Sequence, residues 1–127
     1  MTDAEKDLRA HLESLLALCD KAAVVAGRCN RDSFANDEIV QLAIFALIGQ
    51  FGEMSRRMLE RFPDFSEDHP ELPFAKAKGM RNRIVHEYEG VDLDIVWATF
   101  NIAIPQFGAA LRPIVKAFDE YHGISKP

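Results

Sequence analysis

The residues best suited to chemistry lie in one short segment, Met80–Tyr88, which holds Arg81, Asn82, His86 and Tyr88. Arginine offers a planar, permanently charged fork that matches the oxygens of a phosphate group. Histidine gains and loses a proton near neutral pH, so it can act as a general acid or base. The pair suits cleavage of an RNA phosphodiester bond. His86 would move the proton of the 2′-hydroxyl or of the leaving 5′-oxygen, and Arg81 would stabilise the charge of the transition state.

This chemistry requires no metal ion and no other cofactor. The acids beside the histidine, Glu87 and Glu89, form no ligand set with a second histidine at a recognisable spacing. The two cysteines, Cys19 and Cys29, are too few for a disulfide framework or a complete zinc site. We therefore expect no metal site, and two reduced thiols in a cytoplasmic protein.

Charge is distributed unevenly along the chain. The net charge of −5 argues against a protein that coats nucleic acid through a generally basic surface. Between Pro73 and Val85, however, the chain has four basic residues and no acidic one, and acidic stretches flank this run. An anionic ligand would be drawn there, so Lys78 and Arg83 are candidate RNA contacts. For Arg83 the alternative is a solvated side chain paired with Glu87, four residues on.

Apolar residues recur at steps of three and four along nearly the whole chain, which predicts an all-α fold. The length fits one domain, residues 1–127, with 123–127 as a frayed tail. No window reaches eighteen apolar residues, so we expect no membrane span. Pro105 should kink the last helix rather than end it, because the apolar stripe continues beyond it. The expected helices are about 3–25, 37–62, 74–86 and 93 onward, with a turn at 33–37 and a loop at 63–73.

Rotation about the third expected helix separates two faces. Ala77, Met80 and Ile84 share the natural core stripe, whereas His86 points away from it. Arg81 and His86 are about 140° apart on a regular helix, so they cannot easily meet within one chain. Either the helix ends before His86, or two chains build one cleft around a dimer axis.

The second expected helix favours the dimer. Its first half, Ile39–Phe51, is apolar on nearly all faces, which a chain this small would cover partly with a second copy. Gly49 and Gly52 lie inside this helix, where close approach of another helix usually compensates for the cost of glycine. For Glu53 we prefer a structural hydrogen bond at the dimer interface over support of the Met80–Tyr88 segment.

The arrangement Arg81, four residues, His86, one residue, Tyr88 resembles the motif of HepT-like proteins in the HEPN superfamily. The polar residue that follows the arginine is also common there. Ile48–Glu53 is similar to the family's glycine–glutamate stretch, and Val91–Trp97 is similar to the segment after the motif. The resemblance extends over most of the chain between about residues 37 and 111.

The resemblance implies an antiparallel bundle of four or five helices that dimerises with the motifs facing one cleft. It implies a metal-independent ribonuclease toxin of a bacterial toxin–antitoxin pair, with Arg81 and His86 as catalytic residues and Asn82 and Tyr88 in support. The implied partner is a minimal nucleotidyltransferase antitoxin. In some such pairs the antitoxin transfers AMP onto the motif tyrosine, here Tyr88, which would put bulk and negative charge beside the catalytic residues.

Two other interpretations remain open. In the first, the basic segment belongs to a non-catalytic module that binds a nucleotide or RNA and pairs with the nucleotidyltransferase. In the second, the chain is a helical adaptor without an anionic ligand. The basic run between two acidic stretches counts against the adaptor.

Overall fold

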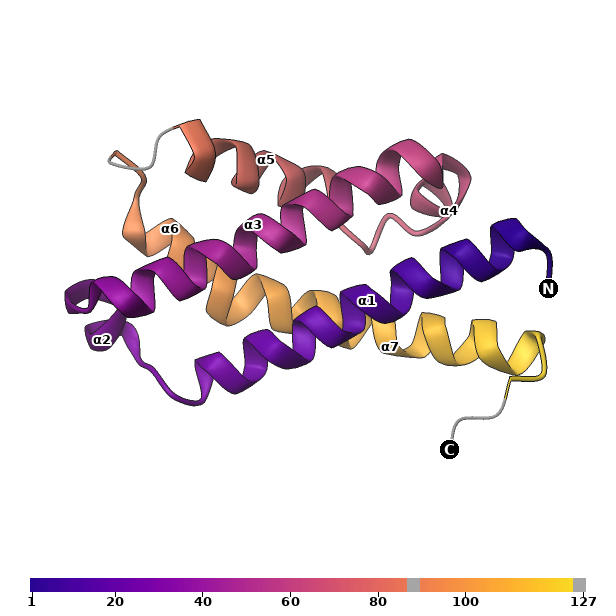
Figure 1. The fold of residues 1–127 in the computed structure, drawn as a ribbon, viewed down its shortest axis with the longest axis horizontal. Coiled ribbons are helices and arrows are strands. Elements are labelled where there is room, and N and C mark those ends of the chain that lie inside the picture. Colours follow the sequence, from indigo (N-terminus) through magenta and orange to yellow (C-terminus); the bar gives the residue numbers. More distant parts are fainter. Residues whose placement is uncertain (87–89, 125–127) are drawn as a thin grey trace.

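The structure is a computed structural model that describes residues 1–86 and 90–124, and its regular elements are helices (Figure 1). The prediction of an all-α fold is confirmed. Within the described residues, none of these helices is long and apolar enough to cross a membrane. The elements are α1 (Asp3–Ala26), α2 (Arg31–Asn36), α3 (Glu38–Arg61), α4 (Pro63–Asp68), α5 (Phe74–His86), α6 (Leu93–Ala98), the π-helical segment η1 (Thr99–Ala103) and α7 (Ile104–Tyr121).

The long helices alternate in direction. In Figure 1, α3 runs back along α1, α5 runs back along α3, and α6, η1 and α7 form one rod that again opposes α1. Both termini consequently lie at the same end of the bundle. This is the antiparallel bundle that the resemblance implied.

Local signals fix the helix starts. Thr2 and Glu5 form a reciprocal capping box at the start of α1, which satisfies two otherwise unpaired backbone N–H groups. The side chain of Asp37 accepts a hydrogen bond from the backbone N–H of Ile39 and caps α3. Asp92 caps α6 in the same way.

Two expected connections are partly helical. The expected turn at 33–37 is wrong: α2 occupies most of it, because Asn30 and Ser33 form a second reciprocal capping box. The expected loop at 63–73 begins with α4, and Pro63 is its first residue. Proline is tolerated there because the backbone N–H of the first helical residue has no partner within the helix, so its absence costs nothing. Residues 125–127 of the expected tail lie outside the described residues.

The last helix continues through Pro105 with a local change of winding. The backbone angles are helical at Thr99 and at Ile104, and η1 ends two residues before Pro105. A π turn suits this place, because proline lacks an N–H and its ring would clash with the carbonyl of a regular preceding turn. The prediction that the helix continues past Pro105 is confirmed, and the kink itself stays a prediction.

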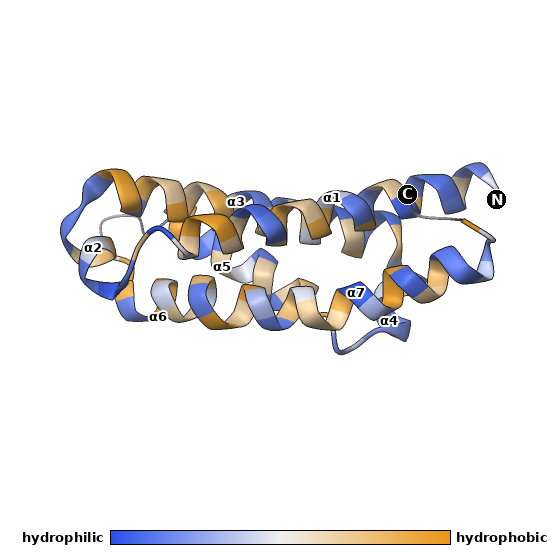
Figure 2. Ribbon diagram, turned by 90° about the horizontal axis from the view of Figure 1, so that it is seen from below, coloured by the Kyte–Doolittle hydropathy of each residue, from blue (hydrophilic) through white to orange (hydrophobic). Residues whose placement is uncertain are grey.

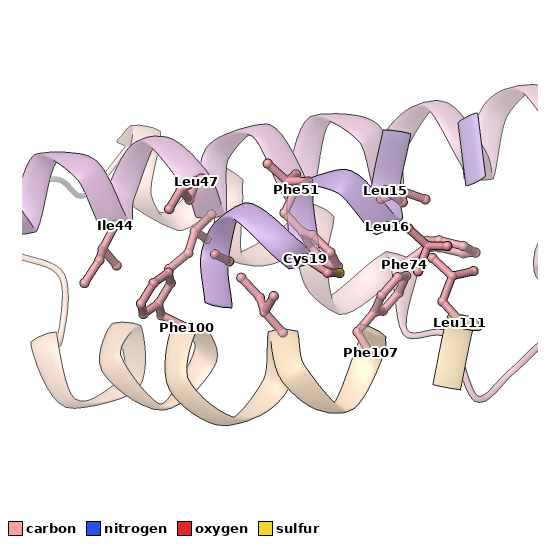
Figure 3. Close-up of a cluster of buried hydrophobic side chains, with 14 of the residues drawn as sticks. Leu15, Leu16, Cys19, Ile44, Leu47, Phe51, Phe74, Phe100, Phe107 and Leu111 are labelled. Atoms are coloured by element: carbon pink, nitrogen blue, oxygen red, sulfur yellow. The ribbon is translucent and has the colours of Figure 1, made fainter. Parts of the chain in front are cut away.

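One apolar core runs the length of the bundle. Figure 3 shows side chains of α1, α3, α5 and the α6–α7 rod converging on its centre. Phe51 and Phe107 meet edge to face with ring centroids 4.7 Å apart, and Phe74 joins Phe107 at 5.6 Å. Phe100 is buried, and Trp97 stacks on Phe34 at 5.6 Å. These aromatic residues thus belong to the core or pack against it.

The first half of α3 carries more apolar surface than this core covers. Figure 2 shows hydrophobic residues gathered on that half of the helix. Ile39 is 78% exposed and Leu42 is 49% exposed. Burying such side chains in a second surface would be favourable by about 1.5–3 kcal/mol each.

Candidate functional site

The helix α5 is held to the core by a few apolar side chains, and most of its polar residues point outward. Within it Phe74 and Ile84 are buried, and Ala77 and Met80 are half-buried against the core, as the rotation predicted. Asn82 and His86 are both exposed, so they are available to a ligand. Tyr88, the expected modification site, lies outside the described residues, as do Glu87 and Glu89.

Arg81 stands at a point where α5 touches α3. A Cβ atom built on Gly52 would lie 2.4 Å from the Arg81 Cβ atom and 2.7 Å from the carbonyl oxygen of Ala77. Real Cβ atoms do not approach so closely, so this contact requires glycine at position 52. The same construction at Gly49 meets nothing within 4 Å. The expected close approach of a helix is therefore confirmed at Gly52 and not found at Gly49.

Glu53, next in sequence, lies beside the Arg81 guanidinium. The Arg81 Nε atom lies 3.7 Å from Glu53 Oε2, and Arg56 donates to the same carboxylate at 2.6 and 3.1 Å. The hydrogen bonds from Arg56, with the charges of Arg81 and Arg57, lower the pKa of Glu53 to about 2. Within one chain Glu53 therefore contacts the Met80–Tyr88 segment through Arg81, while its preferred role at a dimer interface stays a prediction.

The Glu53–Arg56 pair was not foreseen. Its signal was in the sequence, since residues three apart on a helix lie on neighbouring turns. Arg56 also contacts Glu60, four residues on, at 2.6 Å. Arg57 lies 3.6 Å from the Glu53 carboxylate, so three guanidinium groups surround Glu53, and the side chain of Arg81 keeps 34% of its surface exposed. A half-buried arginine whose Nε lies beside a carboxylate can still offer its other N–H donors to a phosphate group.

Arg81 and His86 do not share one face of α5. The helix extends through His86, so the alternative in which it ends earlier is wrong. Five positions along a regular helix rotate the two side chains about 140° apart. Arg81 faces α3, through Gly52 and Glu53, while His86 is exposed at the last position of the helix. Convergence of these two groups therefore requires a second chain or a rearrangement of α5.

The remaining cations of α5 have no anionic partner among residues 1–86 and 90–124. Elsewhere several arginines are paired: Arg9 with Asp119, and Arg61 with Asp7. Lys76, Lys78 and Arg83 form no ion pair in the described part of the chain. They carry three positive charges on one helix of a chain whose net charge is −5, and the alternative partner of Arg83, Glu87, lies outside the described residues.

The described residues offer little for other kinds of chemistry. No group of three or more His, Cys, Asp or Glu side chains in the part of the chain that the structure describes could hold a metal ion. Cys19 is buried, and this burial raises the pKa of its thiol to about 11, so it is not an activated nucleophile. The exposed Arg, Asn and His groups of α5 remain the chemically capable set.

Comparison with known proteins gives the same assignment as the motif. A sequence model of the family described as "Ribonuclease HepT-like" matches residues 8–114. A Methanocaldococcus jannaschii protein named "Putative RNase" is 27% identical over 116 residues, 91% of this chain and 97% of that protein. A Thermococcus cleftensis protein named "Probable ribonuclease HepT" is 32% identical over 85 residues, 67% of this chain and 74% of that protein. No solved structure matches the chain.

Proposed function

This chain belongs to the ribonuclease HepT-like family, and on that premise we propose that it cleaves RNA with Arg81 and His86 as catalytic residues. His86 moves the proton of the 2′-hydroxyl or of the leaving 5′-oxygen. Arg81 stabilises the added charge on the phosphate. Asn82 and Tyr88 support these groups, and Lys78 and Arg83 contact the RNA backbone. The reaction uses side chains alone and needs no metal ion.

The position of Arg81 is the observation that carries the proposal. The first carbons of its side chain pack on Gly52, and its guanidinium lies 3.7 Å from Glu53 on a helix with several basic residues. A guanidinium with a fixed base and a free edge is organised in advance for a phosphate, so less entropy is lost when the phosphate binds.

We propose further that the working form is a homodimer in which Arg81 of one chain and His86 of the other share each site. The separation of these side chains around α5 supports this arrangement, as does the exposed apolar surface at Ile39 and Leu42. Two equivalent sites then lie around one dimer axis.

The proposal also includes regulation. A toxin of this kind would be neutralised by a minimal nucleotidyltransferase antitoxin, through AMP transfer to Tyr88 or through steric blocking. Incubation with that partner and ATP should raise the intact mass of the protein by AMP units, and Tyr88→Phe should remove the increase. An unchanged mass on the native chain would leave steric blocking alone.

The first experiment measures cleavage of a single-stranded RNA by the purified protein in the presence of EDTA. We expect cleavage that Arg81→Ala or His86→Ala abolishes, while Lys116→Ala, which removes an exposed lysine of α7, leaves it unchanged. Folding of each variant is checked by its circular dichroism and melting temperature. Full cleavage by both α5 variants would show that the assigned site is wrong.

Mixing the two inactive variants tests the shared site. A heterodimer of Arg81→Ala with His86→Ala chains holds one site in which both mutations fall together and one intact site. Because random exchange makes half of the dimers mixed, we expect recovery of about a quarter of the native activity. No recovery after confirmed chain exchange would contradict the shared site.

A non-catalytic module is the alternative function. It would bind RNA or a nucleotide through the basic surface of α5, and it would pair with the nucleotidyltransferase without cutting RNA. RNA binding that depends on Arg81 together with no cleavage by the native protein would favour this alternative.

A further inference from the structure

A cavity of about 580 Å³ lies beside the candidate site, on the side of α5 that faces away from Arg81. Its volume falls in the range of pockets that bind small organic molecules. Three elements enclose it: α5 forms one wall, the η1–α7 rod forms the opposite wall, and α3 lies between them. Its lining includes Phe51, Lys76, Gly79, Arg83, Thr99 and Phe107.

The cavity exists because α5 packs chiefly on α3 and stands off from the α7 rod. Small side chains keep it open: Gly79 and Ala77 on α5, and Ala103 on η1. A Cβ atom built on Gly79 meets nothing within 4 Å, so space remains in front of that residue. The opposing wall includes residues of the π-helical segment, a kind of turn that often occurs at functional sites.

The lining combines an apolar interior with two cations. Phe51 and Phe107, in edge-to-face contact at 4.7 Å, are the aromatic residues of the lining. Lys76 and Arg83 are its only charged residues, and neither has an ion-pair partner within residues 1–86 and 90–124. These two cations are seven positions apart, which places them about 10 Å apart along one side of the helix. Such a lining suits a ligand that is flat and apolar in one part and anionic in another.

We propose that this cavity receives the base of an RNA nucleotide whose flanking phosphates are held by Lys76 and Arg83. The proposal rests on the proposed ribonuclease function and adds to it a subsite for one splayed-out base. Proteins bind single-stranded RNA in this way, with unstacked bases in apolar or aromatic surroundings and the backbone on cations.

Arg83 connects the cavity to the candidate site. It is three positions before His86, so the two residues lie on neighbouring turns of α5. A phosphate near His86 is therefore within one turn of the cavity mouth, and the nucleotide on that phosphate can place its base inside. The cavity would then hold the RNA strand in register for cleavage.

The lining also determines what kind of selectivity to expect. Thr99 supplies the one side-chain hydroxyl of the lining, and that hydroxyl already donates to the carbonyl oxygen of Ile95 at 2.9 Å. It can only accept from a base edge while that bond is kept. The cavity should thus require a base without strongly selecting which base.

The test uses Gly79→Leu, which fills the cavity from a position where the structure has space. Ala75→Leu is the matched control, because it adds the same side chain to an exposed position one turn earlier, outside the lining. Both substitutions should keep or raise helix stability, since leucine is a better helix former than glycine and close to alanine. Equal or higher melting temperatures for both proteins confirm that folding is intact.

Binding is measured by methyl NMR on Met80, Thr99, Ala77 and Ala103, with the four nucleoside 5′-monophosphates as probes and ribose 5-phosphate as the probe without a base. We expect the nucleotides to shift these methyl signals with similar affinities, and ribose 5-phosphate to bind at least about tenfold more weakly. Gly79→Leu should abolish the shifts, and Ala75→Leu should retain them. Absence of shifts in the native protein would overturn the proposal.

Cleavage separates this proposal from the proposed function. We expect Gly79→Leu to lower kcat/KM on a short RNA about tenfold or more. We expect the same loss when the native protein cleaves an RNA with one abasic nucleotide at the cleaved position. Native kcat/KM in both cases would overturn the base subsite and leave the ribonuclease function standing. Nucleotide binding in the cavity without any RNA cleavage would overturn the ribonuclease function and leave the base subsite standing. Conversion of a native dimer to monomer by Gly79→Leu would instead assign the cavity to contact with a second chain.

Discussion

At the scale of single residues, the contact between Gly52 and Arg81 links packing to the candidate chemistry. The missing side chain at Gly52 lets the backbone of α5 approach α3, and that approach sets where the Arg81 side chain begins. Glu53 then holds the guanidinium from the next position on the same helix. A glycine in the middle of a helix lowers helix stability by roughly 1 kcal/mol relative to alanine. At Gly52 the close packing of α5 on α3 explains why glycine is present.

Alanine at Gly52 should therefore damage both stability and activity. Its Cβ atom would clash with Arg81 Cβ at 2.4 Å, so α5 must move away, at a cost of about 1–3 kcal/mol in the free energy of unfolding. Gly49→Ala is the matched control, because its Cβ atom meets nothing within 4 Å and should stabilise α3 by up to about 1 kcal/mol.

Urea denaturation measures both changes, and RNA cleavage measures the displacement of Arg81. We expect Gly52→Ala to lose at least tenfold in kcat/KM under conditions in which it is fully folded. Equal stability and equal activity in the two alanine variants would contradict the role assigned to this contact.

At the scale of elements, α5 buries fewer residues than the other long helices, α1, α3 and α7. It has 13 residues, of which Phe74 and Ile84 are buried, and it packs chiefly on α3. α1 by contrast buries six residues, and it contacts both α3 and α7. A helix that carries reactive groups, forms one wall of a cavity and buries two side chains against chiefly one neighbour is suited to small adjustments when a ligand binds.

Hydrogen exchange should reveal this difference. In the monomer at low concentration, the backbone amides of α5 should exchange through local opening, at a lower free energy than those in the middle of α1 and α3. Mass spectrometry of peptides from each helix measures the rates, and RNA should slow exchange in α5 more than in α1. Protection of α5 equal to that of α1 in the free monomer would contradict this interpretation.

At the scale of the whole molecule, the two ends of the chain are tied together by a paired charge. Arg9 near the start of α1 donates to Asp119 near the end of α7 through Nε at 2.9 Å and Nη2 at 3.3 Å. The side chain of Asp119 is 4% exposed. The antiparallel course of α1 and α7 brings these residues, 110 positions apart, to one end of the bundle.

Removal of this carboxylate should destabilise the fold as a whole. Asp119→Ala leaves Arg9 without its main partner, and we expect the free energy of unfolding to fall by about 1–3 kcal/mol. The control is Asp20→Ala, which breaks the exposed pair between Asp20 and Arg112 and should cost at most about 1 kcal/mol. Chemical denaturation measures both free energies of unfolding. If Asp119→Ala lowers this free energy no more than Asp20→Ala does, the Arg9–Asp119 ion pair contributes little to stability.

The sequence by itself determined the helical class, the helix that carries the motif and the residue types that could act on a phosphate. Periodicity and capping residues are local signals, so the start of α3 at its Asp37 cap and the outward direction of His86 could be predicted from them. It missed α2 and α4, because a short helix depends on its caps and contacts more than on a periodic stripe.

Tertiary structure alone decided the contacts between elements. Which of the two glycines lies under Arg81, which carboxylate braces it, and where α5 leaves a cavity against the α7 rod all depend on distances between segments far apart in the chain. A sequence pattern describes one helix face at a time, whereas these contacts arise from how three helices pack. The segment that the sequence marked as chemical became a candidate site only once the packing of α3 had fixed the position of Arg81.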